Sequence, residues 1–326
     1  MKVLHVVNAW PDDKHPSKAI FIKEQIERLP SSIEVDVHHI GNDKGILKYI
    51  RSVFRVRKIK SNYDLIHAHH VFSSILCIAS GVKKSHLITS FLNNRGFNAL
   101  NVGVEFSKII EKFCAKRSVV NIYKNESFED IRTKEDILLP NSVEAKSFPE
   151  ISSNEARRRL GLNDGLITLL FVSANNLYRQ SKRYDRFSEI VSELEGRGIH
   201  VNVLTMVSVS RENVYLYFNA ADYLICTSDY EGSPNAVKEA LYCGAAIVSV
   251  DVGDVKHQAG GVNNCIIMDS YDASVAVEHI IRIGLRSENS RNVTRCQYRN
   301  RIEGDNDADK IRDAYIKAVK IRENRS

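Results

Sequence analysis

The segment spanning residues 223–250 constrains the fold most, because a strand, a helix and a second strand follow one another closely in it. Tyr223–Thr227 is short and apolar, which is typical of a buried strand. A helix is expected to begin at Ser233–Pro234, since serine is a favoured N-cap and proline suits the first helical position. Gly244 is an ordinary helix stop, and Ala246–Val250 then returns to the sheet. This order of elements predicts an α/β fold.

Two glutamates of this segment are candidates for ligand binding. Glu231 lies on the turn before the helix and Glu239 lies two turns inside it, and neither belongs to the apolar stripe of the helix. The free amides of Asn235 and Ala236 are expected at the positive end of the helix dipole, which suits a diphosphate. A carboxylate beside that site can accept two hydroxyl hydrogen bonds, which suits sugars and riboses. The alternative is a solvated glutamate pair on an ordinary surface helix.

The residues from 231 to 254 also resemble a known family. The glutamate pair, the Glu-Gly-Ser-Pro-Asn turn and the trailing Val-Asp-Val-Gly-Asp run are similar to the donor-site signature of the retaining glycosyltransferases of family 4. The resemblance covers nearly the whole chain, though less tightly in the N-terminal half. It implies the GT-B architecture, in which two Rossmann-like, doubly wound parallel-sheet α/β domains face each other across a cleft. It also implies transfer of a sugar from a UDP- or GDP-sugar donor with retained anomeric configuration.

The resemblance gives roles to the positions that match the family motif. Glu239 would hold the ribose hydroxyls of the donor, and Glu231 would contact the sugar ring and orient the anomeric carbon. The family's front-face reaction needs no protein nucleophile, because the leaving diphosphate takes the acceptor proton. Further donor contacts are expected from the helix start, at Ser233, Pro234, Asn235 and Ala236.

A basic loop follows the almost continuously apolar stretch Leu166–Ser173. Such a stretch is typical of a strand in a parallel sheet that is covered on both faces. The loop resembles the family loop whose arginine and lysine clamp the donor diphosphate, with Arg179 and Lys182 at the matching positions. A fixed cation pair would stabilise the charge that develops on a leaving diphosphate. Arg183 is adjacent to Lys182, so either side chain can point inward. A solvated basic loop is the alternative.

Candidate acceptor contacts lie in the N-terminal half. Asp64–Ala68 predicts a central strand that runs into histidines at positions 67, 69 and 70, and ligands of open α/β sheets gather at the carboxyl ends of strands. His69 is therefore a candidate acceptor contact, with a satisfied structural histidine as the alternative. No metal is expected, since the run alternates faces and lacks an acidic neighbour. Relatives often carry His, Gly and Asp after the next strand, where this chain has Asn93, Asn94 and Arg95. Asn94 and Arg95 are further candidates for sugar or acceptor contact.

The length of 326 residues, with 43% hydrophobic and 26% charged residues, is ordinary for a globular protein and suggests two domains. We expect an acceptor-binding domain at residues 1–163 and a donor-binding domain at residues 164–304. A helix at about residues 305–326 is expected to pack back on the first domain, as in GT-B proteins. The N-terminal apolar run is too short for a signal peptide, and the six cysteines are scattered singly. A cytoplasmic location is therefore expected.

The positive charge is concentrated in the N-terminal half. Residues 1–150 contain 23 lysines and arginines against 17 acidic residues, whereas the two kinds balance in the remainder. The densest part, Lys48–Lys60, interleaves basic residues with an apolar stripe, which suits anionic lipid headgroups. The alternative is a solvated helix whose apolar side packs on its own sheet. A nucleic-acid partner is not expected, because aromatic interleaving stops at Phe54 and no recognition motif is present.

The sequence therefore predicts a retaining glycosyltransferase that needs no cofactor and no metal, since it contains no D-x-D motif. The acceptor would be a glycan or a lipid-linked molecule of cell-envelope polysaccharide synthesis, and the enzyme could sit peripherally on the inner face of the membrane. One alternative is a nucleotide-sugar epimerase or hydrolase on the same fold, with the histidines at 67–70 as acid–base candidates. Another is a non-catalytic nucleotide-sugar-binding or scaffold subunit of a polysaccharide assembly complex.

Overall fold

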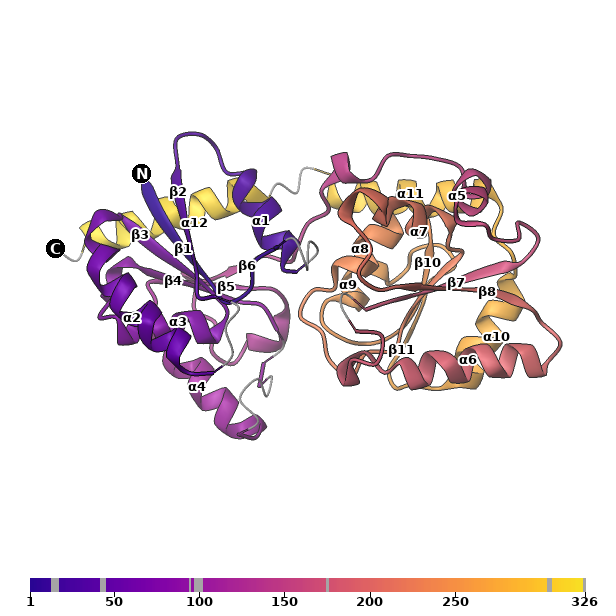
Figure 1. The fold of residues 1–326 in the computed structure, drawn as a ribbon, viewed down its shortest axis with the longest axis horizontal. Helices are drawn as coiled ribbons and strands as arrows, with labels where there is room; N and C mark the ends of the chain where they lie inside the picture. Colours follow the sequence, from indigo (N-terminus) through magenta and orange to yellow (C-terminus); the bar gives the residue numbers. More distant parts are fainter. Residues whose placement is uncertain are drawn as a thin grey trace. The chain divides into compact units, whose positions relative to one another are not determined.

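The computed structural model describes residues 1–12, 18–41, 45–93, 95–96, 102–173, 176–303 and 307–324. It divides into two compact units, each built on one parallel β-sheet (Figure 1). The first unit consists of Met1–Pro11, Lys18–Asn141 and the C-terminal helix. The bulk of the second unit runs from Ser142 to the helix that precedes the C-terminal helix. The expected fold class, two doubly wound parallel-sheet α/β domains, is confirmed.

The sheet of the first unit has the strand order β2-β1-β3-β4-β5-β6, and every pairing is parallel. The strands are β1 (Lys2–Val7), β2 (Glu34–His39), β3 (Leu65–His69), β4 (Leu87–Phe91), β5 (Val120–Tyr123) and β6 (Ile137–Leu138). One face is covered by three helices, α2 (Leu47–Ile59), α3 (Val71–Ala79) and α4 (Val104–Lys116) (Figure 1). The other face is covered by α12 (Asp307–Glu323), against which α1 (Ile20–Glu27) packs. Strands covered on both faces explain the near-continuous apolar runs in the sequence.

Helix α12 belongs to the first unit although it ends the chain. Its apolar residues recur at helical spacing and are buried against β1, β3 and β4; they are Ile311, Ala314, Tyr315 and Ala318. At its first turn, the buried carboxylate of Asp307 accepts hydrogen bonds from Gln25 Nε2 at 3.1 Å and Arg28 Nη2 at 2.7 Å. These bonds tie the start of α12 to the end of α1.

The sheet of the second unit has the order β11-β10-β9-β7-β8 and is also parallel. The strands are β7 (Ile167–Val172), β8 (Val201–Met206), β9 (Tyr223–Cys226), β10 (Ala246–Val250) and β11 (Ile266–Met268). The helices are α5 (Ser153–Leu160), α6 (Tyr184–Gly196), α7 (Val214–Ala220), α8 (Asn235–Tyr242), α9 (Val255–Ala259), α10 (Ala273–Ile283) and α11 (Glu288–Ile302). Helices α6 and α10 pack together on one side of the sheet, and α7 and α8 lie on the other (Figure 1).

The division between the units falls after Asn141 and not at the expected boundary of 163/164. The reason is helix α5, which packs on α7 and carries the buried Arg157. The guanidinium of Arg157 pairs with Asp222 at 2.7 Å and donates to the carbonyl oxygen of Ala220 at 3.0 Å. Because Asp222 immediately precedes β9, this pair fixes residues 142–163 to the second sheet.

Ala19, which precedes α1, has a φ of 52°. This is the left-handed region that favours glycine, and it costs alanine about 1 kcal/mol. Alanine here therefore occupies a conformation that glycine adopts more easily.

Candidate active site

The loops with the candidate residues leave neighbouring strands of the second sheet. From β7 the chain passes to β8 on one side and then returns to β9 on the other side of β7. Ligands of open α/β sheets bind at such a reversal, beyond the carboxyl ends of the strands. The loop after β7 carries Lys182, the loop after β9 carries Glu231, and the loop after β10 carries Asp254. Three adjacent strands therefore bring together residues that are far apart in the sequence.

Lys182 and Glu231 form an ion pair across this reversal. Lys182 Nζ lies 2.6 Å from Glu231 Oε1, and the two side chains are 18% and 16% exposed. Ser228 Oγ donates to the same carboxylate oxygen at 2.8 Å. Burial lowers the pKa of Lys182, but the Glu231 carboxylate outweighs that effect, and the net pKa lies above the usual 10.5. Lys182 is therefore a firmly charged ammonium group beside a half-buried carboxylate.

The neighbouring cations are placed differently. Arg183 has a left-handed φ of 56°, and its guanidinium pairs with Asp185 at 2.7 Å and Asp229 at 3.1 Å. Lys182, and not Arg183, thus meets Glu231, which settles the choice that the sequence left open. Arg179 is exposed in the same loop. Its positive charge lowers the pKa of Lys182, but by less than Glu231 raises it. Thr227 Oγ1 locks the two loops together by donating to the carbonyl oxygens of Lys182 and Arg183.

Helix α8 begins one residue later than expected. Pro234 is its N-cap, with a ψ of 112°, and Asn235 is the first helical residue. The Ser233 hydroxyl does not cap the helix, because it donates to Asp254 Oδ2 at 2.8 Å and accepts a bond from Lys238. Lys238 also pairs with the same oxygen of Asp254 at 2.8 Å. This buried cluster pins the turn before α8, where the first helical amides lack intrahelical partners.

Gly253 allows the turn at Glu231 to approach the loop after β10. Its φ is 60°, and a Cβ at this position would lie 2.6 Å from the carbonyl oxygen of Gly232 and 3.1 Å from that of Glu231. Both atoms belong to the backbone, so neither can rotate away. The glycine of the Val-Asp-Val-Gly-Asp run is therefore required by a close backbone contact.

We expect Gly253→Ala to destabilise the second unit by more than Gly261→Ala, the matched control. Gly261 also has a positive φ, 73°, but nothing lies within 4 Å of its added Cβ. The control therefore carries only the conformational cost, about 1–2 kcal/mol, whereas Gly253→Ala adds a backbone clash. Thermal unfolding of both variants measures the difference. Equal losses of stability would contradict the close contact between Gly253 and the Glu231 turn.

Glu239 faces an arginine that the sequence patterns did not indicate. Its Oε1 accepts a hydrogen bond from Arg211 Nη1 at 2.7 Å, and the Glu239 side chain is 10% exposed. The Arg211 guanidinium also lies over the Phe148 ring, 4.9 Å from its centroid. Glu239 is thus a positioned, mostly buried carboxylate and not a solvated surface residue.

His69 does not lie where the sequence placed it. Its side chain is 1% exposed, and its Nε2 is 2.9 Å from His5 Nδ1. Tyr315 of α12 bonds to both His5 and His67, and His67 Nε2 is 2.8 Å from Ser90 Oγ. The expectation of an acceptor contact at His69 is therefore wrong, because α12 covers this face of the sheet.

His5, His67 and His69 form a group whose potential ligand atoms lie within 4.8 Å of one another, all buried. Five of the six ring nitrogens are engaged in the hydrogen-bond chain just described, and His69 Nδ1 is the exception. Burial lowers the pKa of His5 to about 3 and those of His67 and His69 well below 6.5. A neutral hydrogen-bond network thus explains the geometry. Among the described residues, these three histidines form the one group whose spacing could hold a metal.

Arg95 also differs from its expected role. Its guanidinium pairs with Glu111 and with Asp130 at 3.1 Å, and the backbone amide of Gly96 donates to Glu111 at 2.9 Å. The side chain of Arg95 is 8% exposed, so it holds the loop after β4 and does not face a ligand. Asn94 lies outside the described residues.

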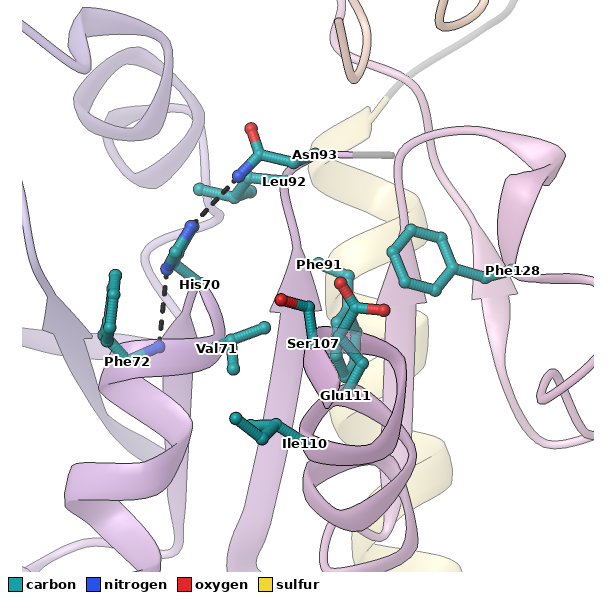
Figure 2. A pocket seen from close by; sticks show the side chains of 10 residues that line it. All are labelled: His70, Val71, Phe72, Phe91, Leu92, Asn93, Ser107, Ile110, Glu111 and Phe128. Atoms are coloured by element: carbon teal, nitrogen blue, oxygen red, sulfur yellow. Dashed lines mark hydrogen bonds between the residues drawn. The ribbon is translucent and has the colours of Figure 1, made fainter. Parts of the chain in front are cut away.

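The structure contains a pocket near these residues, which the sequence did not predict. It lies at the carboxyl ends of β3 and β4, and Figure 2 shows His70, Asn93 and the inner side of α4 around it. His70 has a φ of 83°, and its ring accepts from the amide of Phe72 at 3.3 Å and lies 3.0 Å from Asn93 Nδ2. Burial lowers the pKa of His70 to about 4. The lining otherwise combines apolar side chains with Ser107 and Glu111.

Known proteins resemble this chain in sequence over part of its length and in fold over nearly all of it. Residues 180–301 match the family described as Glycosyl transferases group 1, a segment that contains Lys182, Glu231 and Glu239. No curated protein sequence matches the chain.

Solved structures match over the whole chain. Sucrose-phosphate synthase from Thermosynechococcus elongatus has a TM-score of 0.70 and 13% identity, covering 99% of this chain and 98% of its own. HepE of Anabaena in complex with UDP-glucose has a TM-score of 0.67 and 11% identity, covering 99% and 100%. The α,α-trehalose 6-phosphate synthase from Burkholderia multivorans has a TM-score of 0.65 and 11% identity, covering 100% and 99%.

The fold is accordingly the two-domain, Rossmann-like GT-B fold. The family match over the second unit, together with this fold, supports a glycosyltransferase. In the described part of the chain, no helix is both long and apolar enough to cross a bilayer.

Proposed function

We propose that the chain is a retaining glycosyltransferase of family 4 that transfers a sugar from a UDP- or GDP-sugar. The observation that carries the proposal is the Lys182–Glu231 ion pair at the strand reversal of the second sheet, next to the start of α8. This site offers a fixed positive charge, free helix amides and a hydroxyl-binding carboxylate within one loop cluster. HepE, crystallised with UDP-glucose on the same fold, supports a nucleotide-sugar donor.

The donor diphosphate would lie between Lys182 and the start of α8. The ammonium of Lys182 and the amides of Asn235 and Ala236 would stabilise the charge that develops as the phosphate bond to the sugar breaks. Arg179, exposed in the same loop as Lys182, would add a second cation on the diphosphate. In this role Lys182 gives up part of its contact with Glu231 to the phosphate.

The sugar and the ribose would be held by the two glutamates. Arg211 bonds to Oε1 of Glu239, so Oε2 is the oxygen that we propose for the ribose hydroxyls. Glu231 would accept hydroxyl hydrogen bonds from the transferred sugar and keep its anomeric carbon oriented. The acceptor hydroxyl would attack from the face that the diphosphate leaves, and the diphosphate would take the acceptor proton. This route needs no protein nucleophile, metal or cofactor.

The acceptor would bind in the first unit, at the pocket beside His70. The apolar lining with a few polar groups suits a small part of a larger molecule, and we propose a glycan or lipid-linked acceptor of cell-envelope polysaccharide synthesis. A cytoplasmic enzyme bound peripherally at the inner face of the membrane would reach such an acceptor.

A thermal-shift panel of UDP, GDP, ADP and their sugar conjugates tests the donor site. A nucleotide at a hundred times its dissociation constant should stabilise the protein by about 2.7 kcal/mol. Glu239→Gln should abolish most of the shift for the preferred nucleotide, because an amide accepts fewer hydroxyl hydrogen bonds than a carboxylate. Glu212→Gln, near Arg211 but on an exposed turn, is the matched control and should retain the shift. Equal shifts in both variants would place the ribose elsewhere.

A further inference from the structure

Helix α2 has apolar side chains on two faces. On the inner face, Tyr49, Val53, Val56 and Ile59 pack against the first sheet. This packing is what the alternative to membrane contact, a helix packed on its own sheet, predicted. On the outer face lies a second apolar row, formed by Leu47, Ile50 and Phe54, which are 62%, 45% and 60% exposed. Packing on the sheet thus accounts for four of the seven apolar residues of this helix and leaves three exposed.

Helix α4 repeats this arrangement. Its inner face is buried through Ser107, Glu111 and Cys114. Its outer face carries Phe106, Ile109 and Phe113, which are 52%, 62% and 45% exposed. The spacing of three and four residues places these three side chains in one row along the helix.

The two rows lie on the same side of the first sheet. Helix α3 packs between α2 and α4, and all three cover the face opposite to α12 (Figure 1). A single exposed apolar residue is normal on a protein surface, but rows on neighbouring helices mark an interaction site.

The charges around the rows favour an anionic partner. No acidic residue occurs from Gly45 to Tyr63. The outer face of α2 exposes four cations, Arg51, Arg55, Arg57 and Lys58. On and after α4, exposed cations accompany the apolar row at Lys112, Lys116 and Arg117, while Glu105 is paired with Lys108 at 2.8 Å.

This combination fits a bilayer better than a protein. A second copy of this chain would bring like charges together. Basic side chains around an apolar row suit the headgroup and acyl boundary of an anionic membrane.

We infer that α2 and α4 together form a membrane-docking surface, defined by Leu47, Ile50, Phe54, Phe106, Ile109 and Phe113, that binds anionic bilayers. The inference extends the contact expected at Lys48–Lys60 to a second helix, and it does not depend on the proposed enzymatic activity. Ser107 and Ile110 of α4 line the His70 pocket, so a bilayer docked on α4 lies next to the proposed acceptor site.

Flotation of the full chain with phosphatidylcholine vesicles, with and without phosphatidylglycerol, tests the docking surface. We expect binding only to the anionic vesicles, weakened by added salt. Ile109→Ser/Phe113→Ser and Ile50→Ser/Phe54→Ser should each lower the partition coefficient at least tenfold. Ile316→Ser, which removes a 41% exposed side chain on α12 across the sheet, should leave it unchanged.

A fluorescence measurement guards against misfolded variants. Ile109→Trp in a Trp10→Phe background should shift its emission to the blue with anionic vesicles and be quenched by brominated lipids. The inference is overturned if Ile109→Ser/Phe113→Ser binds as the wild type does, if the chain ignores anionic vesicles, or if the tryptophan emission does not shift. It is also overturned if size-exclusion chromatography with light scattering shows a dimer that this double variant dissolves, because the surface would then join two copies.

Discussion

Replacing Lys182 by methionine is expected to lower the turnover number by about 10²- to 10³-fold, the usual effect of removing one preorganised group that stabilises developing charge. Methionine keeps the aliphatic stem and removes only the ammonium that lies 2.6 Å from Glu231. The raised pKa of Lys182 means that the group is charged throughout the neutral range, so its loss removes a full positive charge. Steady-state release of nucleotide at saturating donor measures the effect.

Arg183→Met is the matched control for this experiment. It removes a cation from the adjacent position, but that cation is already paired with Asp185 and Asp229 on the outer side of the loop. The left-handed φ of residue 183 is the same burden for both side chains. We expect turnover within about threefold of the wild type. A large loss at Arg183 with a small loss at Lys182 would reverse the assignment of the two cations.

Lowering the pH from 7 to 5 is expected to destabilise the first unit by about 2 kcal/mol through His5, whose pKa is lowered to about 3, and by a further amount through His67 and His69. Burial is the main cause of their lowered pKa values, and the positive charge of Lys124 adds to it at His67 and His69. Below pH 6.5 the unfolded chain gains protons on these histidines while the folded chain does not. Their stabilising contribution is therefore complete above the unfolded pKa of about 6.5 and declines as the pH falls toward the folded pKa.

Urea denaturation at pH 7 and pH 5, followed by hydrogen exchange in α12, measures this loss. His69→Gln should reduce the stability difference between the two pH values, whatever its effect on absolute stability. His257→Gln, which changes a histidine of the second unit, is the control and should leave the difference at α12 unchanged. A pH dependence that His69→Gln does not alter would mean that His69 is not held neutral in the folded protein.

Several strands could be predicted from the sequence because they are compact apolar runs. The expected range Ala246–Val250 coincides with β10, and the expected range Tyr223–Thr227 exceeds β9 by one residue. Helices α5 and α11 could not be predicted in this way, since their buried faces consist partly of arginines such as Arg157 and Arg291. Those arginines are satisfied by Asp222 and by carbonyl oxygens at the end of α7 and just beyond it, which no local pattern indicates.

The candidate site was predictable where it depends on a local motif, and not where it depends on distant partners. The sequence indicated Lys182 and Glu231. It assigned the Ser233 hydroxyl to helix capping, because the acceptor that this hydroxyl finds in the structure, Asp254, lies 21 residues further on and outside the local pattern. The sequence did not indicate Arg211, because no pattern in its own loop predicts a contact with Glu239. His69 was misplaced for the same reason, since the burial of its cluster depends on Tyr315, 310 residues after His5.

Product analysis distinguishes sugar transfer with retained configuration from hydrolysis and from binding alone. The nucleotide-sugar that stabilises the protein would be incubated, with its sugar isotopically labelled, with a membrane or glycan extract as acceptor source, and the product analysed by NMR. We expect a labelled glycoside with the anomeric configuration of the donor, formed by the wild type and reduced at least a hundredfold with Lys182→Met. Free labelled sugar alone would indicate a hydrolase, and a bound donor that is never consumed would indicate a binding or scaffold subunit. Either result would contradict a glycosyltransferase activity.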